Sequence, residues 1–247
     1  MTDVQFHHMP DGRRIAFRHT SGAGPALVFL PGYMSDMAGG KACAVFDWAV
    51  ATNHSALLLD YSGCGASAGD FAEGTLTLWR DEVLALISAQ CPGEILFIGS
   101  SMGGWLMLMC ALALPAERRT GLVGLAPAPD FTNWGVSAED KETLLSGNPV
   151  YKPNEYGPEP TPTYPGLWAD GEANRMLDGH IPLNCPVRLI HGQADSDVPW
   201  EISLRLAAAL QSSDVRITMI KDGDHRLSRD QDIALLIQTL ETLVHPS

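Results

Sequence analysis

Residues 94–115, EILFIGSSMGGWLMLMCALALP, decide how this chain is interpreted. Residues 95–114 carry no charged side chain, and about 20 such residues are long enough to span a bilayer as a helix. The same stretch contains GSSMG at residues 99–103, the G-x-S-x-G pattern of a serine held on a tight turn between a strand and a helix. The two interpretations predict very different proteins.

Local context favours a strand and a helix over a membrane span. EILFIG precedes Ser101 and the helix-forming GGWLMLMCALAL follows it, whereas three glycines within residues 99–104 would weaken one continuous helix. A buried strand followed by a buried helix also lacks charges, so we expect no transmembrane segment. A second G-x-S-x-G, at residues 65–69, runs into GDFAEG, which cannot begin a helix promptly. Ser67 is therefore predicted to be a loop residue.

Short apolar runs alternate with helical segments along the chain. The runs expected to form strands lie at residues 13–20, 25–32, 55–63, 94–101, 121–128, 186–192 and 215–223. Helices are expected at residues 41–52, 75–90, 103–114, 201–211 and after Ser228, where Ser228 and Gln231 match a capping box. This alternation indicates an α/β fold, with a mostly parallel central sheet and helices on both faces. Ligands of such sheets bind beyond the carboxyl ends of the strands.

One region interrupts the alternation. We see no repeat and no linker long enough to divide the chain, so residues 1–247 are predicted to form a single domain. Residues 130–180 are dense in proline, glycine, tyrosine and tryptophan, and repeated prolines prevent a long helix or an interior strand there. Irregular insertions of this length are usually functional or mobile. We expect a small cap insertion over the carboxyl ends of the strands.

Composition and charge exclude several classes of protein. A formal net charge of −13 leaves no excess of lysine and arginine to neutralise phosphates, which argues against nucleic-acid binding. The five cysteines are widely spaced and form no C-x-x-C pair, which indicates reduced thiols rather than a disulfide framework or a zinc site. The N-terminal MTDVQFHHMPDGRRIAF lacks the apolar core of a secretory signal. We therefore expect a cytoplasmic protein without a bound metal.

A serine hydroxyl needs a base to become a nucleophile, and the base needs an acid to orient it. The expected chain order on this architecture is serine, acid, histidine. Of the histidines after Ser101, His180 falls near the cap, and His191 ends a strand, where we expect it to be packed and hydrogen-bonded. His245 lies in the tail. His225 follows the last predicted strand in a Gly/Asp turn, from which an imidazole can reach the serine, and it is the predicted base.

Three aspartates are candidates for the orienting acid. Asp195 is favoured because it lies just past the strand at residues 186–192. Asp197, two residues on, is the second candidate, and Asp130, which follows the preceding strand, is an alternative. Ordinary turn chemistry also explains aspartates in such places.

An oxyanion hole and a substrate pocket complete the predicted site. The oxyanion needs two preorganised backbone N–H donors. Met102 follows Ser101 directly, and Tyr33 follows the strand at residues 25–32, so these two residues are the candidates. Apolar residues expected to line the pocket are Tyr33, Met34, Met102, Trp105, Trp168 and Trp200.

Six motifs give the chain a family resemblance: FLPGYMSDMAGGKA, DYSGCGAS, GTLTLWRDEV, GSSMGGWLML, NCPVRLIHGQADSDVPW and DHR. With them the chain resembles α/β-hydrolase-fold serine hydrolases, in particular the mitochondrial α/β-hydrolase-domain palmitoyl-protein thioesterases, which are also associated with acyl-glucuronide hydrolysis. The resemblance extends from about residue 29 to 226, although residues 147–172 fit it poorly. It implies a triad of Ser101, Asp195 and His225, and a cap that lines an acyl pocket.

The combined interpretation is an α/β-hydrolase fold and a serine esterase or thioesterase acting on acyl (palmitoyl-like) groups. The expected substrate is a small molecule or an acylated protein, the reaction needs no cofactor or metal, and an acyl-serine forms on Ser101. One alternative is a small-ester carboxylesterase with no preference for long acyl chains. The other is a hydrolase-fold binding protein without catalysis, which the complete serine, aspartate, histidine order disfavours. Oligomeric state is left open.

Overall fold

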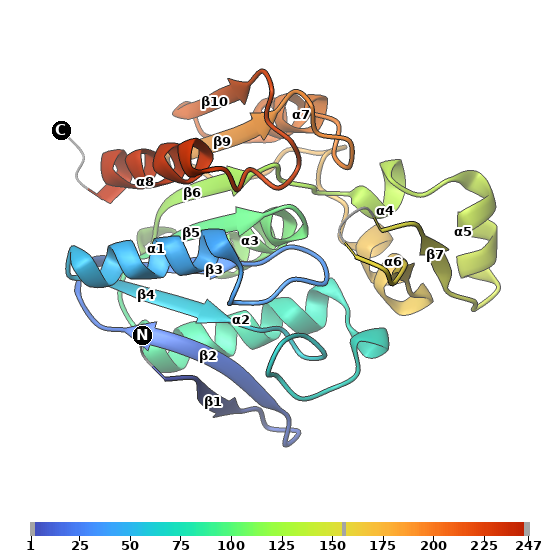
Figure 1. The fold of residues 1–247 in the computed structure, drawn as a ribbon, viewed down its shortest axis with the longest axis horizontal. Helices are drawn as coiled ribbons and strands as arrows, with labels where there is room; N and C mark the ends of the chain where they lie inside the picture. The colour runs from blue at the N-terminus through green and yellow to red at the C-terminus, as the bar shows by residue number, and fades with distance from the viewer. Residues whose placement is uncertain (1–2, 155–156, 245–247) are drawn as a thin grey trace.

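The computed structural model describes residues 3–154 and 157–244. Eight strands form one sheet in the order β1-β2-β4-β3-β5-β6-β9-β10 (Figure 1). Their bounds are Gln5–His8 (β1), Arg14–Thr20 (β2), Ala23–Leu30 (β3), His54–Leu59 (β4), Ile95–Ser100 (β5), Arg119–Leu125 (β6), Val187–Gly192 (β9) and Val215–Ile220 (β10). The last six of these run parallel, whereas β1 and β2 pair antiparallel at one edge.

Each of the seven predicted strands has a counterpart in this sheet. β5 is buried at every residue, because helices cover both faces of the sheet at its centre. The edge strand β1 was not predicted from the sequence. Its four residues, QFHH, are mostly exposed, and they become a strand by pairing with β2 rather than through an apolar pattern of their own.

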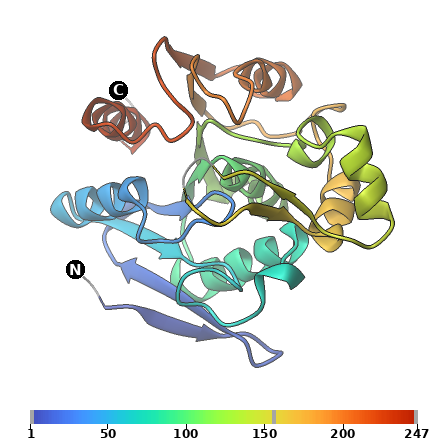
Figure 2. The same cartoon turned by 45° about the vertical axis from the view of Figure 1, so that its right-hand side comes forward.

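Helices cover both faces of the sheet, as predicted (Figure 2). The helices α1 (Gly40–Ala51) and α8 (Asp230–Val244) pack on one face around one apolar cluster. The other face carries α2 (Leu76–Gln90), α3 (Met102–Ala113) and α7 (Glu201–Ala209) around a second cluster. Two short 3-10 turns lie at Phe71–Glu73 and Ala116–Arg118.

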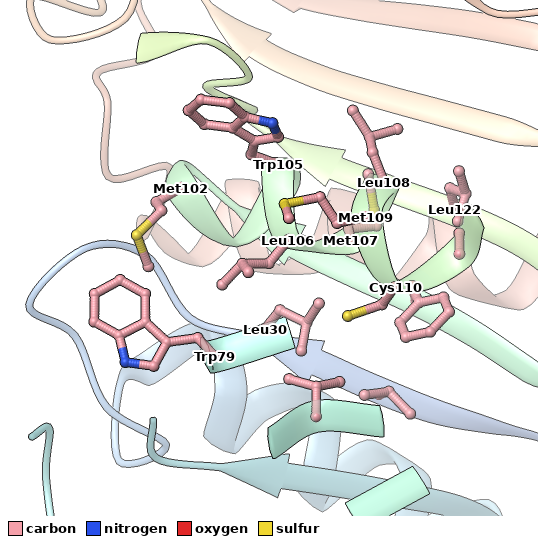
Figure 3. Packing of buried hydrophobic residues seen from close by; sticks show 14 of the residues in the cluster. Leu30, Trp79, Met102, Trp105, Leu106, Met107, Leu108, Met109, Cys110 and Leu122 are labelled. Atoms are coloured by element: carbon pink, nitrogen blue, oxygen red, sulfur yellow. The ribbon is translucent and has the colours of Figure 1, made fainter. Parts of the chain in front are cut away.

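Helix α3 is surrounded by apolar groups on every side. Residues 102–111 are all buried, and Figure 3 shows Met102 and Leu106 of this helix above Trp79 of α2 and Leu30 of β3. Burial between the sheet and α2 therefore explains why residues 95–114 carry no charge. Within the described residues, no helix is long and apolar enough to cross a membrane.

The segment between β6 and β9 projects beyond the carboxyl ends of the strands (Figure 1). Its elements are α4 (Phe131–Trp134), α5 (Ala138–Leu145), β7 (Val150–Lys152), β8 (Thr161–Thr163) and α6 (Pro165–Ala173). All are short, as the prolines require, and Pro165 stands at the first position of α6, where a missing N–H costs nothing. We refer to residues 131–175 as the cap.

One carboxylate joins the two ends of the cap. Asp130 is buried, and its backbone has the left-handed conformation, with φ at 59°. Its Oδ1 accepts a hydrogen bond from the N–H of Met176 and its Oδ2 one from the N–H of Leu177, both at 2.8 Å. The chain therefore enters and leaves the cap at the same point.

The predicted capping box of the last helix is wrong. Ser228 Oγ donates to the carbonyl of Arg226 at 2.9 Å instead of capping the helix. The reciprocal half of a capping box lies one residue further on, because Asp232, the third residue of α8, accepts at Oδ2 from the N–H of Arg229 at 3.1 Å. The same carboxylate pairs with the Arg229 guanidinium.

Replacing Leu106 by alanine is expected to lower the free energy of unfolding by about 2–5 kcal/mol, because this fully buried side chain leaves a cavity between α3 and the sheet. Urea denaturation of the purified variant measures the change. Leu112→Ala, at the exposed C-terminal end of the same helix, is the matched control and is expected to change the free energy by less than about 1 kcal/mol. Equal losses in both variants would contradict the burial of this helix.

Candidate active site

Ser101 stands at the turn between β5 and α3, above the carboxyl end of the sheet. Its backbone is strained, with φ at 54° and ψ at −121°, a combination that residues with side chains rarely adopt. The N–H of Ser101 donates to the carbonyl of Leu125 in β6, and its carbonyl accepts from Gly104 and Ala128. These backbone hydrogen bonds hold the strained turn in place.

The two glycines of the motif are required by close backbone contacts. A Cβ added to Gly99 would overlap the carbonyl of Gly103, and a Cβ added to Gly103 would overlap the carbonyl of Leu30 in β3. Gly104 is similarly confined, because its Cβ would lie 2.6 Å from Cβ of Pro127. The strand can turn this sharply into the helix because none of these positions carries a side chain.

His225 reaches Ser101 from the loop between β10 and α8. Its Nε2 lies 3.1 Å from Ser101 Oγ, within hydrogen-bond distance. The imidazole is largely enclosed, with 14% of the side chain exposed, which leaves an opening toward solvent and substrate. An imidazole in this position can take a proton from the serine hydroxyl and later return it to a leaving group.

Asp195 binds the other ring nitrogen of the same histidine. Its Oδ2 lies 2.8 Å from His225 Nδ1, and its Oδ1 accepts from the N–H groups of Asp197 and Val198 at 2.9 and 2.8 Å. Burial alone raises the pKa of Asp195, but hydrogen bonds from His191, His225 and Val198 outweigh burial and hold the pKa below its ordinary value. The carboxylate is therefore ionised and oriented toward the imidazole.

Backbone contacts between two loops bring Asp195 and His225 together. The N–H of Ala194 donates to the carbonyl of Gly223 at 3.0 Å, and a Cβ added to Gly192 would overlap that same carbonyl. The loops after β9 and β10 consequently lie directly against each other. Gly192 and Gly223 are the sequence signal for this approach.

The other candidate acids lie elsewhere. Asp197 Oδ2 is 4.0 Å from His225 Nε2, the ring nitrogen that faces the serine, so it cannot orient the imidazole from behind. Asp130 joins the ends of the cap.

Two of the remaining histidines are also away from Ser101. His180 is exposed beyond the cap, and His191 is fully buried in β9 with both ring nitrogens hydrogen-bonded. His245 lies outside the described residues.

The candidate oxyanion donors lie on either side of the serine. Met102 is the first residue of α3, so its N–H has no acceptor within the helix. The chain after β3 passes close to the elbow, since a Cβ added to Gly32 would lie 3.2 Å from Ser101 Cβ. Tyr33 follows Gly32 directly. The backbone N–H groups of Met102 and Tyr33 are thus available on the two chain segments nearest Ser101 for an oxyanion formed on its substrate.

A groove of about 400 Å³ begins at Met34, one residue beyond Tyr33. Tyr33 Oη donates to the carbonyl of Pro162 at 2.8 Å. This hydrogen bond joins the chain that follows β3 to the cap beside this groove. The lining residues are Met34, Ser35, Asp36, Gly63, Cys64, Gly65, Phe71, Tyr151, Glu159, Pro160, Pro162 and Tyr164. Burial raises the pKa of the Cys64 thiol to about 12, so this cysteine is not a nucleophile at neutral pH.

The structure places the predicted tryptophans outside the lining of this groove. Trp105 is fully buried, donates from Nε1 to the carbonyl of Asn174 at 3.3 Å, and packs edge-on against Phe131. Trp168 on α6 and Trp200 at the start of α7 are also absent from its lining, whereas Met34 is present. The lining includes neither Ser101 nor His225, so the contact of these tryptophans with substrate stays a prediction.

The serine of the second G-x-S-x-G motif has a structural role. Ser67 Oγ accepts from the N–H of Ala16 at 2.8 Å and donates to the carbonyl of Asp60 at 2.6 Å. It lies in a loop, as predicted, without a histidine partner. Among the described residues, no group of histidine, cysteine, aspartate and glutamate is placed to hold a metal ion.

Comparison with known proteins agrees with this geometry. Residues 87–242 match the family model described as the prolyl oligopeptidase family. The human protein named palmitoyl-protein thioesterase ABHD10, mitochondrial, is 36% identical over 250 residues, covering 98% of this chain and 80% of the human protein. The chain belongs to the α/β-hydrolase family of this thioesterase. It is a serine hydrolase, as the sequence predicted.

Solved structures of this hydrolase family have the same fold. A protein from Agrobacterium vitis S4 superposes with a TM-score of 0.91 and 36% identity, over 98% of this chain and all of that one. Mouse alpha/beta hydrolase domain-containing protein 10 also gives a TM-score of 0.91, with 34% identity and 98% coverage of both chains. The predicted α/β-hydrolase fold and the predicted family are therefore confirmed.

Asp195→Asn is expected to lower kcat by a factor on the order of 10³–10⁴, because the amide disturbs the tautomer of His225 and cannot stabilise its cation. Asp197→Asn, two residues away on the same loop, is the matched control and is expected to cost less than about tenfold. Steady-state hydrolysis of a p-nitrophenyl ester measures both. A larger loss at Asp197 would assign the acid to that residue.

Proposed function

We propose that this hydrolase cleaves acyl thioesters and esters through an acyl-serine intermediate on Ser101. The observation that carries the proposal is the continuous hydrogen-bonded series from Ser101 Oγ through His225 to Asp195, with distances of 3.1 and 2.8 Å. On the strained turn that carries Ser101, this is the order of groups that a nucleophile, its base and the orienting acid require.

The reaction has two halves. His225 Nε2 takes the proton of Ser101 as Oγ attacks the acyl carbonyl, and Asp195 stabilises the imidazolium that forms. The N–H groups of Met102 and Tyr33 bind the oxyanion of the tetrahedral intermediate. His225 then protonates the leaving sulfur or oxygen. Water attacks the acyl-serine with His225 as base, which releases the carboxylic acid and restores the serine.

We further propose that the natural substrate is an acylated cysteine of a protein, with a long acyl chain. The 36% identity with palmitoyl-protein thioesterase ABHD10 over nearly the whole chain supports this substrate class. The groove beside Tyr33 supports it as well, because its volume of about 400 Å³ falls within the range of small-molecule sites. Met34, Phe71 and the cap prolines offer apolar surface for the chain. The cytoplasmic location expected from the sequence stays a prediction.

A fluorophosphonate probe, which reacts with activated serines, is expected to label the wild-type protein. Ser101→Ala is expected to abolish labelling and lower kcat by at least about 10⁴-fold, since the base then has no nucleophile to activate. Ser67→Ala is the control, because that hydroxyl sits in the second motif without a histidine. Labelling that persists in Ser101→Ala would place the nucleophile elsewhere.

A substrate panel distinguishes the candidate functions. p-Nitrophenyl esters from acetyl to palmitoyl, acyl-CoA thioesters and S-acylated peptides are compared by kcat/KM. A preference for long-chain thioesters and acylated peptides supports the proposed substrate class. Turnover of acetyl and butyryl esters alone would instead indicate a small-ester carboxylesterase, and no turnover of any activated ester would indicate a binding protein.

The groove makes a separate prediction. Met34 has φ at 55°, a conformation that asparagine tolerates well, so Met34→Asn removes apolar surface with little backbone strain. We expect kcat/KM for a palmitoyl ester to fall about tenfold, while that for an acetyl ester changes little. Val50→Asn, at an exposed valine on α1, is the control. Equal losses of kcat/KM for the palmitoyl and acetyl esters would show that the acyl chain does not bind in this groove.

A further inference from the structure

The imidazole of His191 also lies beside Asp195. His191 Nε2, from the end of β9, lies 3.2 Å from Asp195 Oδ2, the same oxygen that His225 Nδ1 approaches at 2.8 Å. His191 Nε2 is also 3.1 Å from the carbonyl of Val198, and its Nδ1 is 2.7 Å from Ser203 Oγ on α7. Both His191 and Ser203 are completely buried.

The chemistry of these partners fixes where the hydrogens lie. An ionised carboxylate and a backbone carbonyl only accept hydrogen bonds, so Nε2 of His191 must carry a hydrogen that faces them. In the neutral imidazole, Nδ1 is then the acceptor, and the hydroxyl of Ser203 donates to it. The hydroxyl of Ser203 thereby satisfies the acceptor nitrogen of the tautomer whose Nε2–H faces Asp195.

Four N–H groups surround the Asp195 carboxylate. Oδ1 accepts from the N–H groups of Asp197 and Val198, and Oδ2 lies between His225 Nδ1 at 2.8 Å and the Nε2–H of His191 at 3.2 Å. Without His191, the only partner of Oδ2 would be His225, the histidine that must gain and lose a proton during the reaction. His191 instead holds Oδ2 from the immobile side, because β9 is buried within the sheet.

We propose that His191 is a positioning residue of the triad, whose Nε2–H holds Oδ2 of Asp195 toward His225 while Ser203 anchors the opposite ring nitrogen. This inference rests on the proposed serine-hydrolase mechanism. A histidine that merely satisfied its own hydrogen bonds in the core would not need to share the oxygen that orients the base. Among the hydrogen bonds that hold the pKa of Asp195 down against its burial, the one from His191 contributes most.

Sharing Oδ2 also affects how strongly Asp195 attracts a proton on His225. A carboxylate oxygen with two donors is a weaker acceptor for each of them, so loss of the His191 donor strengthens the attraction for the imidazolium. Other charged groups on or beside the His225 loop are Asp224 and Arg226, its neighbours in the chain, and the Asp222–Arg229 ion pair. Asp197 lies 4.0 Å from Nε2, and the ammonium of Lys41 donates to the carbonyl of Arg226. None of these residues is changed in the comparison below.

The test compares two substitutions at His191 that differ in one hydrogen-bond donor. His191→Met fills a similar volume without a donor, and His191→Gln places an amide N–H near the position of Nε2. We expect His191→Met to lower kcat by up to about 100-fold with KM little changed, and to move the acid limb of the kcat/KM profile to higher pH. We expect His191→Gln to recover most of kcat and the wild-type acid limb.

Two further variants keep the outcome decisive. Ser203→Ala removes the hydroxyl that anchors Nδ1 of His191, and we expect it to shift the acid limb in the same direction as His191→Met. Leu206→Ala makes a cavity in the same helix, α7, and we expect lower stability with a wild-type pH profile. If His191→Met does not fold, the contrast between Ser203→Ala and Leu206→Ala carries the test.

The inference is overturned if folded His191→Met has the wild-type kcat and acid limb, or if His191→Gln loses as much as His191→Met. It is also overturned if Leu206→Ala shifts the acid limb as Ser203→Ala does, because the effect would then be general destabilisation. Failure of the proposed function is distinct from these results. In that case the wild-type protein itself would hydrolyse no activated ester and take no fluorophosphonate label.

Discussion

The backbone of α3 lies so close to the carbonyl of Leu30 that Gly103 has no room for a side chain, and the rest of the site depends on this contact. It places the first turn of the helix directly over β3, so the chain leaving β3 passes beside Ser101. Nucleophile and oxyanion donors are consequently positioned by rigid packing of strand against helix. The strained φ of Ser101 is maintained by the same packing rather than by the serine itself.

The ends of three parallel strands position the three residues of the series. Ser101 follows β5, Asp195 follows β9 and His225 follows β10, and parallel strands bring all three to one edge of the sheet. The contact of Gly192 with Gly223 determines how closely the last two loops approach. Asp195 is held in place because N–H groups face both of its oxygens. Ser101, at the other end of the hydrogen-bonded series, lies beside the partly exposed imidazole of His225.

Sequence alone predicted those parts of the fold and site that depend on neighbouring residues in the chain. β5, the elbow and α3 follow from apolar runs and glycine placement, and the order serine, aspartate, histidine follows from the strand ends. Asp195 and Asp197 could not be separated by geometry from sequence alone, because two residues of one loop differ only in which ring nitrogen they face. Whether Trp105 faces the core or a ligand could not be predicted, because α3 is apolar on every side and such a helix gives no signal for which face meets a ligand.

The cap was the least predictable part, since its irregular chain is organised by distant contacts rather than by periodicity. Asp130 supplies one of these contacts by binding the N–H groups of Met176 and Leu177, 46 and 47 residues further along the chain. The cap therefore forms a closed loop whose two ends are joined beside the sheet by the carboxylate of Asp130. Because the chain enters and leaves the cap at Asp130, a change in the length of the cap would leave the pairing of β6 with β9 in place.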